Sequence, residues 1–154
     1  MINTKMMALW LASVMLLPSY VVAGHHETHE MSPKDVVAAA YATFAAGDTD
    51  AWAKLHTEDL TFTVLGQLPQ SGVFIGTEAV IEGVFAKIPT LWPEFTLTPI
   101  NIDVVGDTVY VHNKRTGEGL DSETMHMFTL RNGKIASFKA FEDTDSMRLA
   151  MKAQ

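Results

Sequence analysis

Two adjacent carboxylates, Glu142 and Asp143, stand where a stretch of alternating apolar and polar residues ends and a short helical stretch begins. Carboxylates at a strand end are suited to general acid–base chemistry when burial or a neighbouring charge shifts their pKa. The same position is suited to helix capping, because Asp143 precedes the polar residues 144–146 and acidic groups favour the first turn of a helix. The sequence is compatible with both interpretations, which do not exclude one another.

His126 is the second candidate for chemistry. It has the same parity as Phe128 and Leu130 in an alternating stretch, so its imidazole is expected to face inward with them. A neutral imidazole in a pocket either donates a hydrogen bond to a ligand oxygen or accepts a proton near pH 7. The alternative is a buried histidine that serves packing only. His112 has the opposite parity to its apolar neighbours and is expected to face outward or to lie at the rim.

A third group follows Ala23, where the sequence reads Gly24-His25-His26. If the chain is cleaved after Ala23, the new amine, two backbone amides and the imidazole of His26 form a square-planar nitrogen site suited to Cu(II) or Ni(II), with His29 nearby. A polar tail without metal is the alternative. Elsewhere the sequence predicts no metal site, and no cofactor is expected.

The first 23 residues have the features of a secretory signal peptide. Lys5 gives a positive start, residues 6–17 are apolar apart from one serine, and residues 21–23 are small or β-branched where signal peptidase requires them. A helix over the apolar run would span about 18 Å, well short of a hydrocarbon core of ~30 Å. The segment is therefore expected to be removed rather than to anchor the chain.

These features divide the chain into a signal peptide over residues 1–23, a polar, histidine-rich N-terminus over residues 24–31 and one domain over residues 32–154. The mature protein is expected to be secreted, into the periplasm of a bacterium. The sequence contains no cysteine, so its stability must come from the core without disulfides. A net charge of −7 disfavours nucleic acid and anionic membranes as partners.

The order of the predicted elements is that of an α+β protein. Helical spacing of apolar residues predicts the helices, alternation predicts the strands, and Asn132-Gly133 predicts a hairpin turn. Helices are expected over residues 33–46, 48–56, 77–88 and 143–150, and strands over residues 60–64, 73–75, 95–105, 108–116, 123–130 and 134–142. A long antiparallel sheet twists and curls, so the helices can cover its concave side and enclose a pocket.

Three stretches carry a resemblance to a known family: "AAYATFAAGDTDAWAKLHTEDLTFTV", "GTEAVIEGVF" and "MHMFTLRNGKIASFKAFEDTDSM". They are similar to the opening helices and first strand, the third-helix start and the closing hairpin of SnoaL-like and ketosteroid-isomerase-like proteins, in the nuclear transport factor 2 superfamily. The resemblance spans residues 32–150. It implies a cone-shaped, curved antiparallel sheet covered by three helices from the N-terminal half, an apolar pocket, and frequent dimers through the outer sheet face.

The resemblance does not extend to the isomerase residues. The family's general-base aspartate corresponds here to Val64, its oxyanion-binding tyrosine to Ala40, with Tyr41 one position further round the helix, and its second carboxylic acid to His126. Because valine cannot accept a proton, the isomerase reaction is not expected.

Two other activities of the family point to Asp143. Epoxide hydrolases of the limonene type share "GKIA" and end the closing strand in an aspartate that Asp143 matches, but they also need an arginine and a second carboxylate. Arg115 or Lys114 could supply the cation, whereas no carboxylate lies between residues 107 and 118, so this machinery is incomplete. Polyketide cyclases of the SnoaL type also use an aspartate near this strand end, which makes Asp143 the favoured catalytic position.

Two functions fit these observations. The first is binding of a small apolar or oxygenated molecule without turnover, and the second is an acid–base enzyme of the isomerase, cyclase or hydrolase type that uses Asp143 and His126. The residues expected to line the pocket are Tyr41, Phe62, Phe85, Trp92, Met127 and Phe128. A homodimer is expected through an outward row on the last strand, Ala136, Phe138 and Ala140.

Overall fold

The computed structural model describes residues 30–152. The predicted signal peptide and the Gly24–His26 metal site lie outside the described residues. The elements, in chain order, are α1 (Pro33–Ala45), α2 (Thr49–Lys54), β1 (His56–Val64), β2 (Gly72–Ile75), α3 (Thr77–Gly83), the 3₁₀ turn η1 (Phe85–Lys87), α4 (Ile88–Leu91), β3 (Thr96–Val105), β4 (Thr108–Gly117), β5 (Leu120–Arg131), β6 (Lys134–Glu142) and α5 (Thr144–Ala150). No helix among them is long and apolar enough to cross a membrane.

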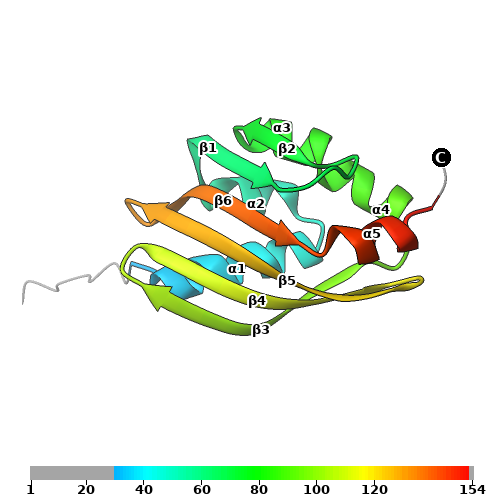
Figure 1. Cartoon of the computed structure of the whole chain (residues 1–154). Helices are drawn as coiled ribbons and strands as arrows, with labels where there is room; N and C mark the ends of the chain where they lie inside the picture. The colour runs from blue at the N-terminus through cyan, green and yellow to red at the C-terminus, as the bar shows by residue number, and fades with distance from the viewer. Residues whose placement is uncertain (1–29, 153–154) are drawn as a thin grey trace, which may run out of the picture.

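The six strands form one sheet in the order β2-β1-β6-β5-β4-β3 (Figure 1). β3 to β6 are a meander of antiparallel hairpins, as predicted, and β1 pairs with β6 in parallel. The parallel pairing arises because the chain leaves β2, crosses through α3 and α4 to the far edge of the sheet, and returns strand by strand to β1. The α+β prediction is confirmed, with one parallel pair in a sheet that was expected to be antiparallel throughout.

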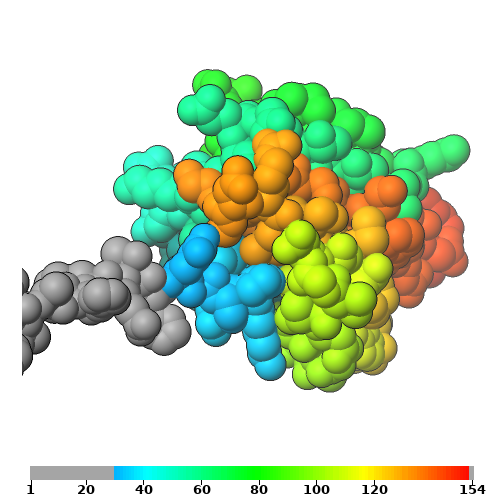
Figure 2. All heavy atoms as spheres, turned by 90° about the vertical axis from the view of Figure 1, so that its left-hand side faces the viewer, coloured from blue at the N-terminus to red at the C-terminus, as the bar shows by residue number. Residues whose placement is uncertain are grey.

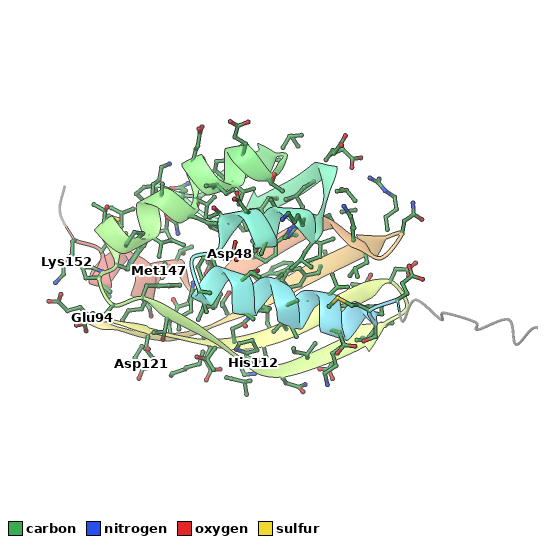
Figure 3. All side chains as sticks on the ribbon, turned by 180° about the vertical axis from the view of Figure 1, so that it is seen from behind. Asp48, Glu94, His112, Asp121, Met147 and Lys152 are labelled. Atoms are coloured by element: carbon green, nitrogen blue, oxygen red, sulfur yellow. The ribbon has the colours of Figure 1, made fainter. Side chains whose placement is uncertain are left out.

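Helices α1 and α2 cover one face of the sheet (Figure 3). The side chain of Ser32 accepts a hydrogen bond from the backbone N–H of Asp35, and Pro33 occupies the first turn, so α1 begins where the sequence predicts. Gly47, with φ of 68°, ends this helix, and Asp48 caps the next. The start of α1 packs beside the turns that join β3 to β4 and β5 to β6 (Figure 2).

The predicted third helix is broken into α3, η1 and α4. A Cβ atom on Gly83 would lie 2.4 Å from the ring of Phe74 in β2, so only glycine allows the helix to approach the edge strand this closely at its last turn. Pro89 lies in the first turn of α4, where a missing N–H costs nothing, rather than at the end of one long helix. These short segments cross the end of the sheet and turn the chain towards β3.

A β-bulge in β6 decides which side chains of this strand face inward. Thr129 pairs with Ser137 and Leu130 with Ile135, which leaves Ala136 as the extra residue. Beyond the bulge, Phe138 and Ala140 face inward, and they are 7% and 1% exposed. The predicted outward row of Ala136, Phe138 and Ala140 is therefore wrong, because the bulge inverts the parity that simple alternation predicts.

The strand register places three phenylalanines side by side on the inner face. Phe62 of β1 pairs with Phe138 of β6, which pairs with Phe128 of β5. The rings of Phe62 and Phe138 stack with centroids 4.0 Å apart, and Phe138 meets Phe128 edge-on at 5.0 Å. This row forms the apolar floor on which α1 and α2 pack, and offset or edge-to-face contacts of this kind add to the stabilisation from burial.

Candidate functional site

A cavity of about 90 Å³ lies between the helices and the inner face of the sheet. It holds several water molecules or part of a small organic ligand. Its walls are mostly apolar and aromatic, and besides Tyr41 five lining side chains carry polar or charged groups: His56, Gln70, Arg115, His126 and Glu142. The lining includes Tyr41, Phe44, Trp52, His56, Phe62, Val64, Gln70, Phe85, Ile88, Leu97, Arg115, His126, Phe128, Phe138, Ala140, Glu142 and Met147. An outer groove between the α1–α2 turn, η1 and the start of β3 shares six lining residues with the cavity: Phe44, Trp52, Phe85, Ile88, Phe95 and Leu97.

Strand alternation places a set of polar residues on the inner face. Asn113 and Arg115 have the same parity as Val109 and Val111 in β4, and His126 takes the inward position opposite Val111 in β5. Each of these five side chains is at most 6% exposed. A buried polar group must find a hydrogen-bond partner, so the partners of these side chains define the chemistry of the site.

Tyr41 supplies the partner of His126. The hydroxyl of Tyr41 lies 2.8 Å from Nδ1 of His126, and Nδ2 of Asn113 donates to the same hydroxyl over 3.1 Å and to the carbonyl of Val111. The hydroxyl proton of Tyr41 has no other acceptor among the described residues, so the arrangement that gives every one of these groups a partner has Tyr41 donating to His126 Nδ1. The imidazole must then carry its proton on Nε2. This N–H makes no hydrogen bond within residues 30–152 and is left for a molecule in the cavity.

Burial keeps both partners uncharged. Desolvation raises the pKa of Tyr41 well above its usual value of 10, against the smaller effect of Asn113. Desolvation, assisted by the positive charge of Arg115, lowers the pKa of His126 to about 3. At neutral pH His126 is therefore a hydrogen-bond donor to the cavity through Nε2, and it is not poised to act as a general base.

His56 is a second neutral histidine in the cavity wall. It opens β1 and is 4% exposed, its ring packs on Trp52 with centroids 3.9 Å apart, and Nδ1 donates to the carbonyl of Trp52 over 2.7 Å. Burial lowers its pKa to about 4, although the bond to Trp52 opposes this shift. With the proton on Nδ1, Nε2 of His56 carries a lone pair, so the two histidines differ in the hydrogen bonds that they can form.

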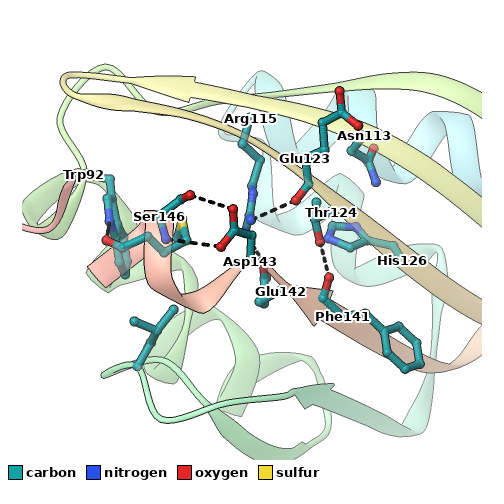
Figure 4. Close-up of polar contacts among 12 residues, drawn as sticks. Trp92, Asn113, Arg115, Glu123, Thr124, His126, Phe141, Glu142, Asp143 and Ser146 are labelled. Carbon is teal, nitrogen blue, oxygen red and sulfur yellow. Dashed lines mark hydrogen bonds and ion pairs between the residues drawn. The ribbon is translucent and has the colours of Figure 1, made fainter. Parts of the chain in front are cut away.

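Arg115 and Glu142 form an ion pair at the other end of the cavity (Figure 4). The side chains of Arg115 and Glu142 are 2% and 9% exposed. Nη2 of Arg115 also donates to the carbonyl of Glu123 over 3.2 Å. Desolvation lowers the pKa of Arg115 to about 10, so the guanidinium remains charged at neutral pH. A pair held this far from water is costly to break, because either partner alone would be an uncompensated buried charge.

Asp143 lies next to this pair in the sequence but points out of the cavity. Its carboxylate accepts hydrogen bonds from the backbone N–H and the hydroxyl of Ser146, at 3.2 and 2.5 Å, and it is exposed (Figure 4). These two bonds, with a smaller contribution from Arg115, lower the pKa of Asp143. The capping interpretation is confirmed. Asp143 and His126 do not converge on one cavity, and Glu142 takes the place that Asp143 was expected to occupy.

The other predicted lining residues divide into two groups. Tyr41, Phe62, Phe85 and Phe128 line the cavity. Trp92 instead belongs to a separate cluster beneath α5, where its indole N–H donates to the carbonyl of Met147 over 2.8 Å. Met127 lies on the outer face of the sheet, because it has the opposite parity to His126.

Three side chains of the site, His56, Gln70 and Asn113, are not singled out by the sequence, which names Arg115 and Glu142 only as a possible cation and as the neighbour of Asp143. His56 was placed on a helix rather than at the start of a strand, and Gln70 lies in the loop after β1. For Arg115 a signal existed: it lies four and six residues after Val111 and Val109 in one strand, which predicts the same inward face. An arginine at such a position must have a buried partner.

No group of three or more histidine, cysteine, aspartate or glutamate side chains in the described part of the chain is arranged to hold a metal ion. The polar groups of the cavity are an arginine–glutamate pair, two neutral histidines, a tyrosine and two amides. This arrangement can bind a ligand by hydrogen bonds.

The fold and the site together are those of a small, cavity-forming α+β domain. Residues 37–138 match the family model of the SnoaL-like domain, and the chain belongs to this family. The sequence matches no curated protein.

Solved structures show the same nuclear transport factor 2-like fold. An NTF2-like protein from Burkholderia thailandensis superposes with a TM-score of 0.74 at 23% identity, over 80% of this chain and 99% of that chain. TerC, co-crystallised with polyporic acid, has a TM-score of 0.71 at 23% identity over 77% and 98% of the two chains. A protein from Catenulispora acidiphila with a ketosteroid isomerase-like fold, in complex with trimethylamine, has a TM-score of 0.62 at 18% identity over 73% and 88%.

The buried histidines make the stability of the domain depend on pH. The folded-state pKa values of His126 and His56, about 3 and about 4, lie below the value of 6.5 for an exposed histidine. Between these values the unfolded chain binds protons that the folded chain does not, so stability falls as the pH falls below 6.5. Each histidine contributes up to about 1.4 kcal/mol per pH unit.

We expect urea unfolding at pH 7, 6 and 5 to show this loss, and His56→Gln to reduce the slope. His112→Gln is the matched control, because His112 lies on the outer face, 39% exposed, and bonds only to Glu123. A slope unchanged by His56→Gln would contradict the buried, neutral state of His56.

Proposed function

We propose that this protein is an exported SnoaL-like domain protein that binds a small, largely apolar, oxygen-containing molecule in the cavity. The observation that carries the proposal is the buried imidazole of His126, whose Nδ1 is bonded to the Tyr41 hydroxyl and whose Nε2, the nitrogen assigned the proton, has no partner among the described residues. It is a fixed donor in an otherwise aromatic wall, and one or a few placed polar groups in an apolar cavity are typical of small-molecule sites.

Two structural relatives support ligand binding. TerC was co-crystallised with polyporic acid and the Catenulispora acidiphila protein forms a complex with trimethylamine, each with a fold shared by this chain. Because the identities are low, these ligands support a small-molecule site and do not identify the molecule.

The alternative, an acid–base enzyme that uses Asp143 and His126, has less support. Asp143 is engaged in capping α5, and the low pKa of His126 removes it as a base at neutral pH. Binding without established turnover is therefore the function that the geometry supports best.

Acetophenone, which combines an aromatic ring with one carbonyl, is a suitable probe for the donor. We expect it to perturb NMR signals of the cavity residues, and we expect His126→Phe to weaken its binding about tenfold, since one lost hydrogen bond is equivalent to about 1.4 kcal/mol. His112→Phe, a matched change on the outer face, should leave the affinity unchanged. Equal affinity in His126→Phe, with the fold verified by circular dichroism, would remove His126 from the site.

The second part of the proposal is a homodimer through the outer face of the sheet. Tyr110, Met125 and Phe141 are 38%, 41% and 47% exposed there. Met125 pairs with Phe141, and Tyr110 pairs with the half-buried Met127, so the four form a contiguous apolar patch on β4 to β6.

A charge in the middle of this patch should prevent association. We expect light scattering to give a dimer mass for the wild-type protein and a monomer mass for Met125→Glu. Leu149→Glu is the control, because Leu149 is 74% exposed on α5, away from the patch. A wild-type monomer at micromolar concentration would contradict the dimer.

Export is the third part of the proposal, supported by the apolar run at residues 6–17 and the small residue at Ala23. In a bacterial host we expect fractionation to place the protein in the periplasm and intact-mass spectrometry to give a chain that begins at Gly24. Replacing Leu11 by Arg, which interrupts the apolar run, should retain the unprocessed chain in the cells. A full-length chain beginning at Met1 in the periplasm would contradict cleavage.

A further inference from the structure

Three polar side chains of the cavity wall remain besides the tyrosine and the histidines: Gln70 from the loop after β1, and the paired Arg115 of β4 and Glu142 of β6. We refer to them as the arginine end. Gln70 and Arg115 are 3% and 1% exposed. Within residues 30–152, Oε1 of Gln70 and Nε of Arg115 have no hydrogen-bond partner. Buried polar atoms are rarely left without a partner, so these two are available to a molecule in the cavity.

The charges that face the cavity cancel. The positive charge of Arg115 is compensated by Glu142, with which it is paired. The other titratable side chains in the wall are uncharged at neutral pH, because desolvation raises the pKa of Tyr41 and lowers those of His56 and His126. The cavity thus offers hydrogen bonds without net charge.

A charged ligand would disturb this balance. A carboxylate placed against Arg115 would have to compete with Glu142 and would leave one negative charge without a partner away from water. An ammonium group drawn to Glu142 would leave one positive charge in the same way. Uncompensated charge in a buried site carries a large desolvation cost, whereas an uncharged polar group has no such cost once it is hydrogen-bonded.

We propose that the ligand is an uncharged molecule with an apolar body and polar groups at two separated points, one bonded to His126 Nε2–H and the other to the arginine end. This inference rests on the proposed function and assigns the chemical class of the ligand. It excludes carboxylic acids in their ionised form and amines in their protonated form.

The strand register sets the spacing of the two anchors. Arg115 pairs with Ser122, and His126 lies four residues further along β5. The Arg115 side chain extends back to Glu142, which pairs with Thr124, two residues from His126, so at about 3.3 Å per residue the arginine end lies ~7 Å from His126 along the sheet. The aromatic rings of Phe62, Phe128 and Phe138 flank this path near His126, so they are suited to contact the apolar body of the ligand.

Benzamide, benzoate and benzylammonium test the inference, because they share one ring and differ mainly in the charge of the attached group. At pH 7.5 we expect calorimetry or ligand-detected NMR to show that the wild-type protein binds benzamide at least about tenfold more tightly than either ion. Benzoate or benzylammonium binding as tightly as benzamide would overturn the inference.

Glu142→Gln is the diagnostic variant. It leaves Arg115 without its counter-charge, so benzoate affinity should rise at least about tenfold relative to benzamide affinity. The matched control is Asp143→Asn, which removes the adjacent, exposed carboxylate and should leave the ranking unchanged. An unchanged ratio of benzoate to benzamide affinity in a folded Glu142→Gln protein would overturn the role of the Arg115–Glu142 pair.

A second variant tests the inference if Glu142→Gln cannot be obtained as a folded protein. If Glu142→Gln does not fold, the double variant Arg115→Gln/Glu142→Gln, which is neutral, should still prefer benzamide, and preference for an ion would overturn the inference. If acetophenone binds and none of the three probes does, the charge inference fails and the proposed binding function stands. If no probe of either set binds, both fail.

Discussion

The hydrogen bond between Tyr41 and His126 connects helix α1 to the inner face of the sheet, and much of the site depends on it. It satisfies a histidine that strand alternation forces inward, and it determines which ring nitrogen carries the proton. Asn113 completes the arrangement by donating to the same hydroxyl. Removing any member would leave a buried polar group without a partner, so the polar residues act as a unit.

The curved sheet makes room for this unit. Helices pack against the row of Phe62, Phe138 and Phe128, while the polar positions of β4 and β5 lie further along the same face. The bulge at Ala136 is essential to this arrangement, because it brings Phe138, Ala140 and Glu142 to the inner face together. The bulge in β6 therefore places Phe138 in the apolar floor and Glu142 beside Arg115 as its counter-charge.

Members of a family with one fold can differ in function because the inward positions of the same strands carry different side chains. By resemblance, the positions that the ketosteroid isomerases use for proton transfer correspond here to Val64, Ala40 and His126. The cavity wall is apolar at Val64 and Ala40, and His126 is a neutral hydrogen-bond donor in it. Chemistry that needs a poised base at neutral pH is disfavoured at His126, and hydrogen-bonded recognition is favoured.

The sequence by itself determined the α+β class, the start of α1 at Ser32, the hairpin at Asn132-Gly133, the inward face of His126 and the helix cap at Asp143. All of these follow from local rules, namely capping chemistry, turn residues and the two-residue period of a strand. Local rules did not predict the break in the third helix. The segment α3 ends at Gly83, where the backbone approaches the ring of Phe74, and this contact is made through the tertiary fold.

Only the tertiary structure decided which polar groups meet. Tyr41 and His126 are 85 residues apart in the chain, and Arg115 reaches Glu142 only because a bulge inverts the last strand. Trp92 and Met127 are residue types that often line pockets. Trp92 packs instead in the cluster beneath α5, and the alternation of β5 places Met127 on the outer face. Local patterns specify the conformation of each segment, whereas partners distant in the chain are specified by register and packing, which no short stretch of sequence contains.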